Sequence, residues 1–465
     1  MRQVPGPDAA FLSGETSEWH FHVSALTILE TEDSDRYSFA GVRDTLARRI
    51  HRVPQFRWKL HPAPMTALAR PYWVDDENFD IDWHLNHIAL PTPGDDRALS
   101  RLVGRLLSSQ IDRTRPLWEM WLIDGLEGGR SALLAKIHHS IIDGQSGAEL
   151  ATLLFDLEAD PAPEPEPAPW TPEPPPGSNE IVGDIVRRAS VWPYRIGQMA
   201  AQFASQSVTY ARHTFGDQPT THPFQAPRVS INGKLTPSRS FASASVSLDE
   251  AKSVKNAFGV KLNDVIVAIV AGVLRSYLID RSELPDTPLV AQIPVSMRIE
   301  DDAHIGTKVS MMFAAMATDV EDPGERLLRI GATTSAAKEM RAALTAQQIM
   351  SLTENTPPAL VSLAALAWTA GGLDSSAPPV FNTIVSNIPG PPFDFYLAGA
   401  RVQAMFPMGP LLFGSGLNFT VVSNATRLDV GVLACPDLVP DAWDVAGRVQ
   451  PALDELVEAA ASLSD

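Results

Sequence analysis

The chain has 465 residues, 45% of them hydrophobic, which is enough to bury large cores and favours two or more domains. Its formal net charge of −18 disfavours nucleic acid as a partner, because phosphate groups bind to basic surfaces. The single cysteine, Cys435, excludes an internal disulfide and a cysteine-rich metal site, as is typical of proteins in a reducing cytoplasm.

Neither the N-terminal residues nor the apolar stretches have the pattern of an export signal or a membrane span. The first residues run into 11–15 without the apolar core of a signal peptide, so we expect no secretion signal. The most apolar stretches, 265–274 and 359–370, are shorter than the roughly 20 residues that cross a bilayer. We therefore expect a cytoplasmic protein that is soluble or peripheral to a membrane or lipid droplet.

The first elements in chain order are a short helical or irregular entry and a strand. Residues 8–30 begin with this entry and continue with an alternating run at 19–29, which predicts the strand. Residues 39–52 carry apolar side chains at helical spacing, with Ser38 as the candidate N-cap. We interpret both segments as packing elements.

Acidic and histidine side chains cluster between residues 78 and 90 and suggest a metal site. The cluster contains Asp80, Asp82, His84 and His87, which alternate with apolar residues. This period of two is typical of a half-buried strand that presents its polar side chains to solvent. We therefore expect no metal ion here.

A β-hairpin is predicted next, after a helix over 97–110. Two apolar runs, 118–126 and 131–137, are separated by Glu-Gly-Gly-Arg, whose glycines adopt positive φ at low cost. Residues 145–157 then show helical spacing of alanine and leucine. The residues between hairpin and helix are therefore held at a strand end.

Those residues are the most reactive stretch of the chain, Lys-Ile-His-His-Ser-Ile-Ile-Asp-Gly at 136–144. His138 and His139 point to opposite faces because they are consecutive on a strand, so one is expected to react and the other to support it. A histidine in a cleft accepts a proton from a hydroxyl or thiol at neutral pH without a metal. The alternative, a pair of hydrogen-bonded core histidines, does not explain the coincident Asp143-Gly144 turn.

This segment, together with Arg-Pro-Leu-Trp at 115–118, resembles the signature of the bacterial wax ester synthase/diacylglycerol acyltransferase family. The HHxxxDG motif is shared with chloramphenicol acetyltransferase-like enzymes and condensation domains, and the Pro-Leu-Trp hairpin narrows the choice. The resemblance implies an α/β fold of two chloramphenicol acetyltransferase-like domains with a substrate channel at their interface. It implies His139 as the general base and His138 as its support.

The same resemblance assigns structural roles around the motif. Asp143 is expected to pair with Arg298, because the resemblance brings the Pro-Val-Ser-Met-Arg segment alongside the Asp143-Gly144 turn. Glu15, in the Asp-x-x-Phe-Leu-x-x-Glu pattern that opens such chains, is expected to line the channel with Trp118 and Ser386. The alternative for Glu15 is a solvated carboxylate at a helix end.

A proline-rich stretch divides the chain. Residues 161–176 mix prolines with glutamates and predict an exposed, stiff linker. Residues 180–213 follow with a helical pattern, expected to pack against the second domain, with a lipid-surface role as the alternative. We accordingly predict an N-terminal domain at 1–158, a linker with connecting helices at 159–225, and a C-terminal domain at 226–465.

The C-terminal domain opens with a strand at 240–248 and a helix that ends near Gly259. Residues 262–264 are then expected to cap an apolar, buried helix at 265–278, with Asn263 as the N-cap. The family has an Asn-Asp pair at the corresponding place. The resemblance therefore implies that Asn263 also helps to stabilise an oxyanion.

The remaining elements extend the resemblance over nearly the whole chain. Strands are predicted at 288–298, 416–423 and 427–434, and a long helix at 325–350. Thr307 stands where relatives usually have asparagine, and a ligand contact there is therefore not carried over. Ser386 belongs to a Ser-Asn-Ile-Pro-Gly-Pro stretch that is also similar to the family.

The resemblance implies an acyl-CoA-dependent O-acyltransferase that converts diacylglycerol to triacylglycerol and long-chain alcohols to wax esters. No metal and no cofactor is expected, with acyl-CoA as a substrate. The enzyme is expected at a lipid surface, because its acceptor and product are nearly insoluble in water. The alternatives are a condensation-type or polyketide-associated acyltransferase, and a catalytically silent lipid-binding protein.

Overall fold

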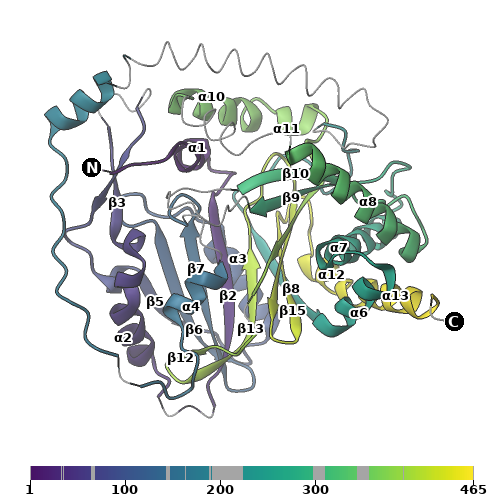
Figure 1. Cartoon of the computed structure of the whole chain (residues 1–465), viewed down its shortest axis with the longest axis horizontal. Coiled ribbons are helices and arrows are strands. Elements are labelled where there is room, and N and C mark those ends of the chain that lie inside the picture. Colours follow the sequence, from purple (N-terminus) through teal and green to yellow (C-terminus); the bar gives the residue numbers. More distant parts are fainter. Residues whose placement is uncertain are drawn as a thin grey trace.

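The computed structural model describes residues 2–32, 34, 36–63, 69–142, 147–162, 164–187, 190, 224–296, 309–342, 356–390 and 392–463. Two six-stranded sheets lie side by side, and helices cover them (Figure 1). A three-stranded sheet of β1 (Arg2–Gln3), β4 (Tyr72–Asp75) and β3 (Trp58–His61) lies beside the first of them. The predicted α/β class is confirmed.

The first six-stranded sheet is built around the predicted hairpin. Gly128 and Gly129 form its turn with φ of 76° and 62°, values that side-chain-bearing residues rarely adopt. His22 and His138 are paired in register on neighbouring strands. The order across the sheet is β12 (Tyr396–Leu397), β13 (Ala400–Met408), β2 (His22–Glu30), β7 (Arg130–His138), β6 (Trp118–Leu126) and β5 (Leu85–Ala89).

Helices of the N-terminal half follow the predicted positions. The side chain of Ser38 accepts the backbone N–H of Gly41 at 3.0 Å, so Ser38 is the N-cap of α2 as predicted. The helices are α1 (Gly6–Gly14), α2 (Phe39–Arg49), α3 (Asp96–Leu107) and α4 (Gly147–Leu154).

The strand predicted over 78–90 is correct only in its second part. Asp80 accepts the backbone N–H of Asp82 at 3.0 Å and starts a short 3₁₀ helix, Ile81–Trp83, before β5. This local hydrogen bond competes with the extended conformation that the alternation predicts. His84 and His87 each bond to the protein, to the Trp118 carbonyl at 2.8 Å and to the Asp124 carboxylate at 2.6 Å.

The second six-stranded sheet contains the largest hydrophobic core. Its order is β10 (Val309–Ala315), β9 (Val290–Ser296), β11 (Thr383–Ile388), β14 (Leu417–Asn424), β15 (Arg427–Ala434) and β8 (Ser240–Ser247). The helices packed in this half are α6 (Leu248–Phe258), α7 (Leu262–Ile279), α8 (Pro323–Ala342), α12 (Ala442–Ala446) and α13 (Val449–Ala461).

Helix α7 is the central helix of this core. Among the described residues it alone is long and apolar enough to cross a membrane, but most of it is buried inside the protein, as is typical of a core helix. It begins at Leu262, and its N-cap is Lys261, whose backbone N–H donates to Asp264 at 3.0 Å. The prediction that Asn263 is the N-cap is therefore wrong, because Asp264 satisfies that end of the helix.

The predicted domain division does not coincide with the sheets. Strand β13, from the C-terminal part of the chain, pairs with β2 and completes the first sheet. The backbone N–H of Met405 in this strand donates to Asp429 of the second sheet at 3.0 Å. Residues 396–408 therefore belong to the first sheet, an exchange that the order of elements in the sequence does not reveal.

The linker is exposed and irregular over the described part of 161–176, as predicted. The helical residues 178–187 after it pack on the first half of the molecule, where Ile181 joins a small core with Tyr72. The Tyr72 hydroxyl donates to Asp184 at 3.0 Å. The prediction that residues 180–213 pack against the second domain is therefore wrong for residues 180–187. Residues 191–213 lie outside the described part of the chain.

Candidate active site

The two histidines of the motif lie where β7 ends. His138 is the last residue of the strand, and its backbone N–H donates to the Leu117 carbonyl at 2.9 Å. The backbone N–H of His139 donates to the Phe21 carbonyl at 2.7 Å. The backbone of both residues is therefore fixed by the neighbouring chain segments.

The His138 ring is fully enclosed, with 1% of the residue exposed. The backbone N–H of Ser140 donates to its Nδ1 at 3.1 Å, and the Ser140 hydroxyl lies 2.7 Å from the same atom. Nδ1 is thus an acceptor, which places the proton of the neutral ring on Nε2. Burial, with the charge of Arg113 and the neighbouring His139, lowers the His138 pKa to about 3.

A buried carboxylate faces that Nε2 atom. The Glu15 side chain is 2% exposed, and its Oε2 lies 3.9 Å from Nε2 of His138. Arg113 Nε donates to the same Oε2 at 3.1 Å, and Arg113 also donates to the Leu12 carbonyl at 2.7 Å. The alternative of a solvated Glu15 is therefore wrong, and the buried Glu15 carboxylate, paired with the exposed Arg113, lies beside the His138 ring.

The His139 ring has a different environment. Its ring packs against Phe11 with 4.3 Å between centroids, and the residue is partly exposed. Its Nδ1 is buried and has no hydrogen-bond partner among the residues that the structure describes. Burial lowers the pKa of His139 below its usual value. The ring is thus neutral at pH 7 and does not share its proton with a described protein group.

Comparison with protein families identifies the chain. Residues 5–266 match the model of the wax ester synthase/diacylglycerol acyltransferase catalytic domain, and residues 305–457 match the model of the WS/DGAT C-terminal domain. The chain belongs to the WS/DGAT family. The family expected from the motif is therefore confirmed, and the matched ranges contain the first six-stranded sheet and all strands of the second except β9.

Individual relatives agree with this result. The chain is 35% identical to a Mycobacterium tuberculosis protein that bears the name of a diacylglycerol O-acyltransferase, over 98% of this chain and 90% of that one. It is 32% identical to the O-acyltransferase WSD of Acinetobacter baylyi, over 95% of this chain and 93% of that one.

Solved structures support the fold. The wax ester synthase/diacylglycerol acyltransferase from Marinobacter aquaeolei superposes with a TM-score of 0.72 at 28% identity, covering 99% of this chain and all of that one. The starter condensation domain of rhizomide synthetase gives 0.53 at 14% identity, with 99% and 94% coverage, which shows a shared fold alone. The chloramphenicol acetyltransferase-like architecture is thereby confirmed.

Several predicted WS/DGAT site residues lie outside the described part of the chain. These are Asp143, Gly144, Arg298 and Thr307. The Asp143–Arg298 pair therefore stays a prediction, as does the role of the Asp-Gly turn.

Trp118 is a core residue, which corrects its assignment to the channel. It is 2% exposed, stacks on Phe56 and His84, and donates its indole N–H to the Phe56 carbonyl at 2.8 Å. A side chain enclosed in this way fixes the hairpin that ends in the histidines. Its contribution to the site is therefore indirect, through packing.

Asn263 and Ser386 lie in the half of the molecule built on the second sheet. Asn263 is half-buried in the first turn of α7, and Ser386 is half-buried on β11 opposite Thr420. Neither side chain forms a hydrogen bond within the described part of the chain. Their roles toward a substrate stay predictions.

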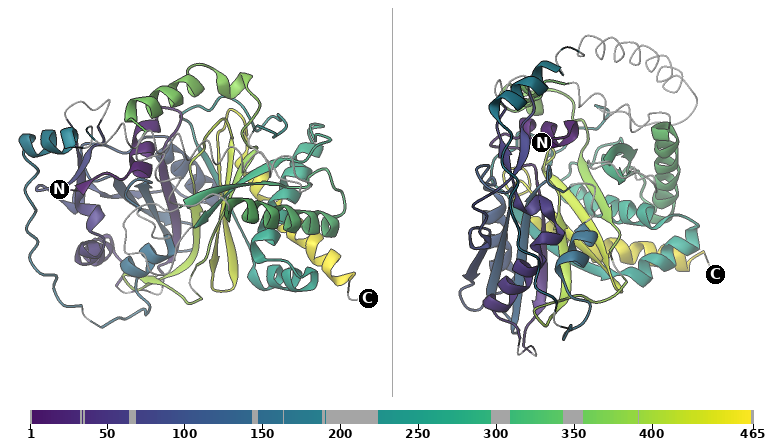
Figure 2. Two further views of the ribbon diagram at one scale, coloured as in Figure 1. Left: turned by 45° about the horizontal axis from the view of Figure 1, so that its top comes forward. Right: turned by 60° about the vertical axis from the view of Figure 1, so that its left-hand side comes forward.

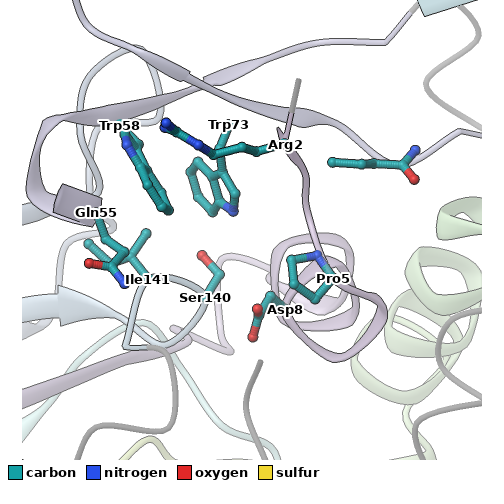
Figure 3. A pocket seen from close by; sticks show the side chains of 9 residues that line it. Arg2, Pro5, Asp8, Gln55, Trp58, Trp73, Ser140 and Ile141 are labelled. Carbon is teal, nitrogen blue, oxygen red and sulfur yellow. The ribbon is translucent and has the colours of Figure 1, made fainter. Parts of the chain in front are cut away.

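A cavity of about 210 Å³ reaches the motif from the small sheet (Figure 3). Ser140 and Ile141, directly after the histidines, form part of its wall, and Trp58 and Trp73 close it on the opposite side. The other residues that line it are Arg2, Gln3, Pro5, Asp8 and Gln55.

Sequence reasoning missed several groups of this site, namely Phe11, Arg113, Ser140, Trp58 and Trp73. Phe11 belongs to the recognised Asp-x-x-Phe-Leu-x-x-Glu pattern, and Ser140 lies inside the HHxxxDG motif, so both carried a signal. Arg113 is 98 residues from its partner Glu15, and neither tryptophan differs in sequence from an ordinary core residue.

Proposed function

We propose that this WS/DGAT protein transfers an acyl group from acyl-CoA to the hydroxyl of diacylglycerol, forming triacylglycerol, and to long-chain alcohols, forming wax esters. The observation that carries the proposal is the neutral His139 ring, partly exposed and without a described hydrogen-bond partner at the end of the HHxxxDG strand. The relatives named diacylglycerol O-acyltransferase and O-acyltransferase WSD support the substrate class.

The proposed reaction uses His139 twice. His139 accepts the proton of the acceptor hydroxyl as its oxygen attacks the thioester carbonyl carbon. The tetrahedral intermediate then breaks its carbon–sulfur bond, and the CoA sulfur takes the proton from His139. An ester and CoA thiol are formed, and the histidine returns to its neutral state.

The groups around His138 are suited to positioning rather than to proton transfer. Nδ1 of His138 accepts a hydrogen bond from Ser140, and Nε2, which has no hydrogen-bond partner among the described residues, lies 3.9 Å from the buried Oε2 of Glu15, so the unpaired nitrogen of this ring is directed at a protein carboxylate. It fixes the loop that follows β7. The developing oxyanion requires a donor, and the side-chain amide of Asn263 is the proposed one.

The chemistry requires no metal ion and no cofactor besides its acyl-CoA substrate. In the described part of the chain, no three His, Cys, Asp or Glu side chains are grouped as metal ligands. A neutral histidine supplies the base without one.

Two alternatives differ in measurable ways. A condensation-type or polyketide-associated acyltransferase takes its acyl group from a carrier protein, and the relatives named diacylglycerol O-acyltransferase and O-acyltransferase WSD favour the lipid acyltransferase. A silent lipid-binding protein would hold acyl chains and release no CoA thiol.

The enzyme is proposed to work in the cytoplasm at a lipid surface, without spanning it. Its acceptor and product remain in the lipid phase, so the protein must reach them there.

The test is incubation of the purified protein with labelled palmitoyl-CoA and a panel of acceptors that includes diacylglycerol and hexadecanol. Labelled triacylglycerol or wax ester should form together with an equal amount of CoA thiol. If no CoA thiol is released with any acceptor, the proposed function is wrong. Activity with an acylated carrier protein alone would identify the condensation-type alternative.

A further inference from the structure

Helix α10 (Pro358–Thr369) is the most apolar exposed element of the described chain. No charged residue occurs between 355 and 373, a run that includes the whole helix. At 12 residues it is too short to cross a bilayer. Its length and its lack of charge allow it to contact an apolar surface but not to span a bilayer.

One face of α10 is bound to the protein. Ser362 donates its hydroxyl to the Ser13 carbonyl at 2.7 Å, Ala365 is buried, and the Trp368 ring packs against Phe413 at 5.7 Å. Figure 2 shows α10 lying directly against α1. The helix is therefore anchored and is not a free terminus or loop.

The opposite face carries three leucines in contact with solvent. Leu360, Leu363 and Leu366 are exposed by 56%, 63% and 52%, and their three-residue spacing places them along one side of the helix. Leu373, just beyond the helix, is 40% exposed. Single exposed leucines are common, but a contiguous apolar patch without charges marks an interaction surface.

The patch lies next to the candidate active site. Helix α1, on which α10 packs, carries Phe11, and the Phe11 ring contacts His139 with 4.3 Å between centroids. A surface that docks through the outer face of α10 therefore meets the protein on the side where α1 supports the histidine.

We propose that Leu360, Leu363 and Leu366 dock the enzyme onto an uncharged lipid surface, that of neutral lipid covered by zwitterionic phospholipid. The proposal rests on the proposed function, because the acceptor and product are neutral lipids. The charge of the protein favours an uncharged lipid surface over an anionic one. The patch has no lysine or arginine, and the formal net charge of −18 is repelled by an anionic bilayer.

The test is flotation of the full chain with triolein droplets coated with phosphatidylcholine. The droplet-bound fraction of the variant L360Q/L363Q/L366Q should be at least about tenfold lower than that of wild type, because three leucines no longer enter the lipid. The matched control, L157Q/L328Q/L463Q, changes three leucines exposed by 60%, 51% and 60% elsewhere and should float like wild type. Single L363Q should show a smaller loss if the triple variant folds poorly.

Turnover separates this inference from the proposed function. With diacylglycerol in droplets, L360Q/L363Q/L366Q should lose turnover in parallel with flotation, while turnover with a short, water-soluble alcohol stays at the wild-type level. If wild type has no transferase activity with either acceptor, the proposed function fails, and flotation still reports on the helix.

Three outcomes overturn the docking surface. The first is unchanged flotation of the triple variant with normal folding. The second is equal or stronger binding of wild type to phosphatidylglycerol vesicles, which contradicts the selection by charge. The third is a wild-type dimer that the triple variant converts to monomer without a change in flotation, since a second copy would then cover the leucines.

Discussion

The two sides of the β7 strand end differ in the protein groups that surround the histidine ring. On one side, Ser140 and the Glu15–Arg113 pair enclose the His138 ring and define its tautomer. On the other, His139 contacts the apolar ring of Phe11 and keeps Nδ1 without a described partner. Each ring has one nitrogen without a described hydrogen-bond partner, but that of His138 faces the buried Glu15 carboxylate, whereas His139 is partly exposed and can exchange a proton with a substrate. The difference predicts distinct effects for changes on the two sides.

The largest effect is expected for His139→Ala. Removal of a general base typically lowers the rate about 10² to 10⁴-fold, and the missing ring breaks no described hydrogen bond. The melting temperature and palmitoyl-CoA binding should stay close to wild type. His51 is exposed and provides the control, because His51→Ala should change neither the turnover nor the melting temperature. Near-normal turnover of His139→Ala would remove the distinction between the two sides.

Asn263→Ala is expected to have the next largest effect. If the amide donates to the oxyanion, kcat should fall roughly 10² to 10³-fold. Stability should change by less than about 1 kcal/mol, because Lys261 and Asp264 rather than Asn263 close the start of α7. Urea unfolding and turnover measured on the same variant test both parts. A loss of stability with normal kcat would show that Asn263 has only a structural role.

The enclosed ring predicts a pH dependence of stability. The His138 pKa is lowered to about 3 from its usual 6.5, so between these values the unfolded chain binds a proton that the native chain does not. The stability contributed by the neutral His138 is fully present above pH 6.5. As the pH decreases below this value, the free energy of unfolding falls by up to about 1.4 kcal/mol per pH unit because of this group. Burial lowers the pKa of His20 to about 4, so His20 contributes to the same slope.

Comparison of wild type with His138→Gln isolates the contribution of His138. The slope of the unfolding free energy between pH 6.5 and 4.5 should be smaller in the variant. An identical slope would mean that His138 is protonated in the native protein, and the tautomer deduced from Ser140 would then be incorrect.

A smaller effect is expected for Ser140→Ala. The hydroxyl contact to Nδ1 is lost, but the backbone N–H still donates to that atom, so stability should fall by about 0.5 to 1.5 kcal/mol. Turnover should decrease only a few-fold, since the His139 side is unchanged. A loss as large as that of His139→Ala would place the reactive group on the His138 side.

EDTA is expected to have no effect on turnover. Neither side of the strand end has a set of metal ligands among the described residues. Loss of activity on chelation, with recovery on addition of zinc, would require a different mechanism.

Local elements were predictable because their causes lie within a few residues. The glycines of the β6–β7 turn, the Ser38 cap and the alternation of β2 each act over a short stretch. Asn263 shows the limit of this reasoning. Its residue type suits a cap, but the side chain of Asp264 accepts the Lys261 N–H and a hydrogen bond from Thr334, which is 70 residues away.

Long-range arrangement could not be predicted from sequence periodicity. The pairing of β13 with β2 joins residues more than 370 positions apart, as in the register of Met405 with Thr27. The pair of Glu15 with Arg113 and the packing of α10 on α1 are equally non-local. Because a strand or helix pattern does not specify its partner, the motif predicted two unlike histidines but not the groups that make them unlike.

The pH profile of kcat/KM, with palmitoyl-CoA and diacylglycerol, tests the central claim most directly. For wild type it should be flat from pH 8 to 6.5 and fall only below, because the lowered pKa keeps His139 neutral. The residual rate of His139→Ala should lack this titration, whereas His138→Gln should retain it. A profile that titrates above pH 7, or one that His139→Ala leaves unchanged, would contradict the account.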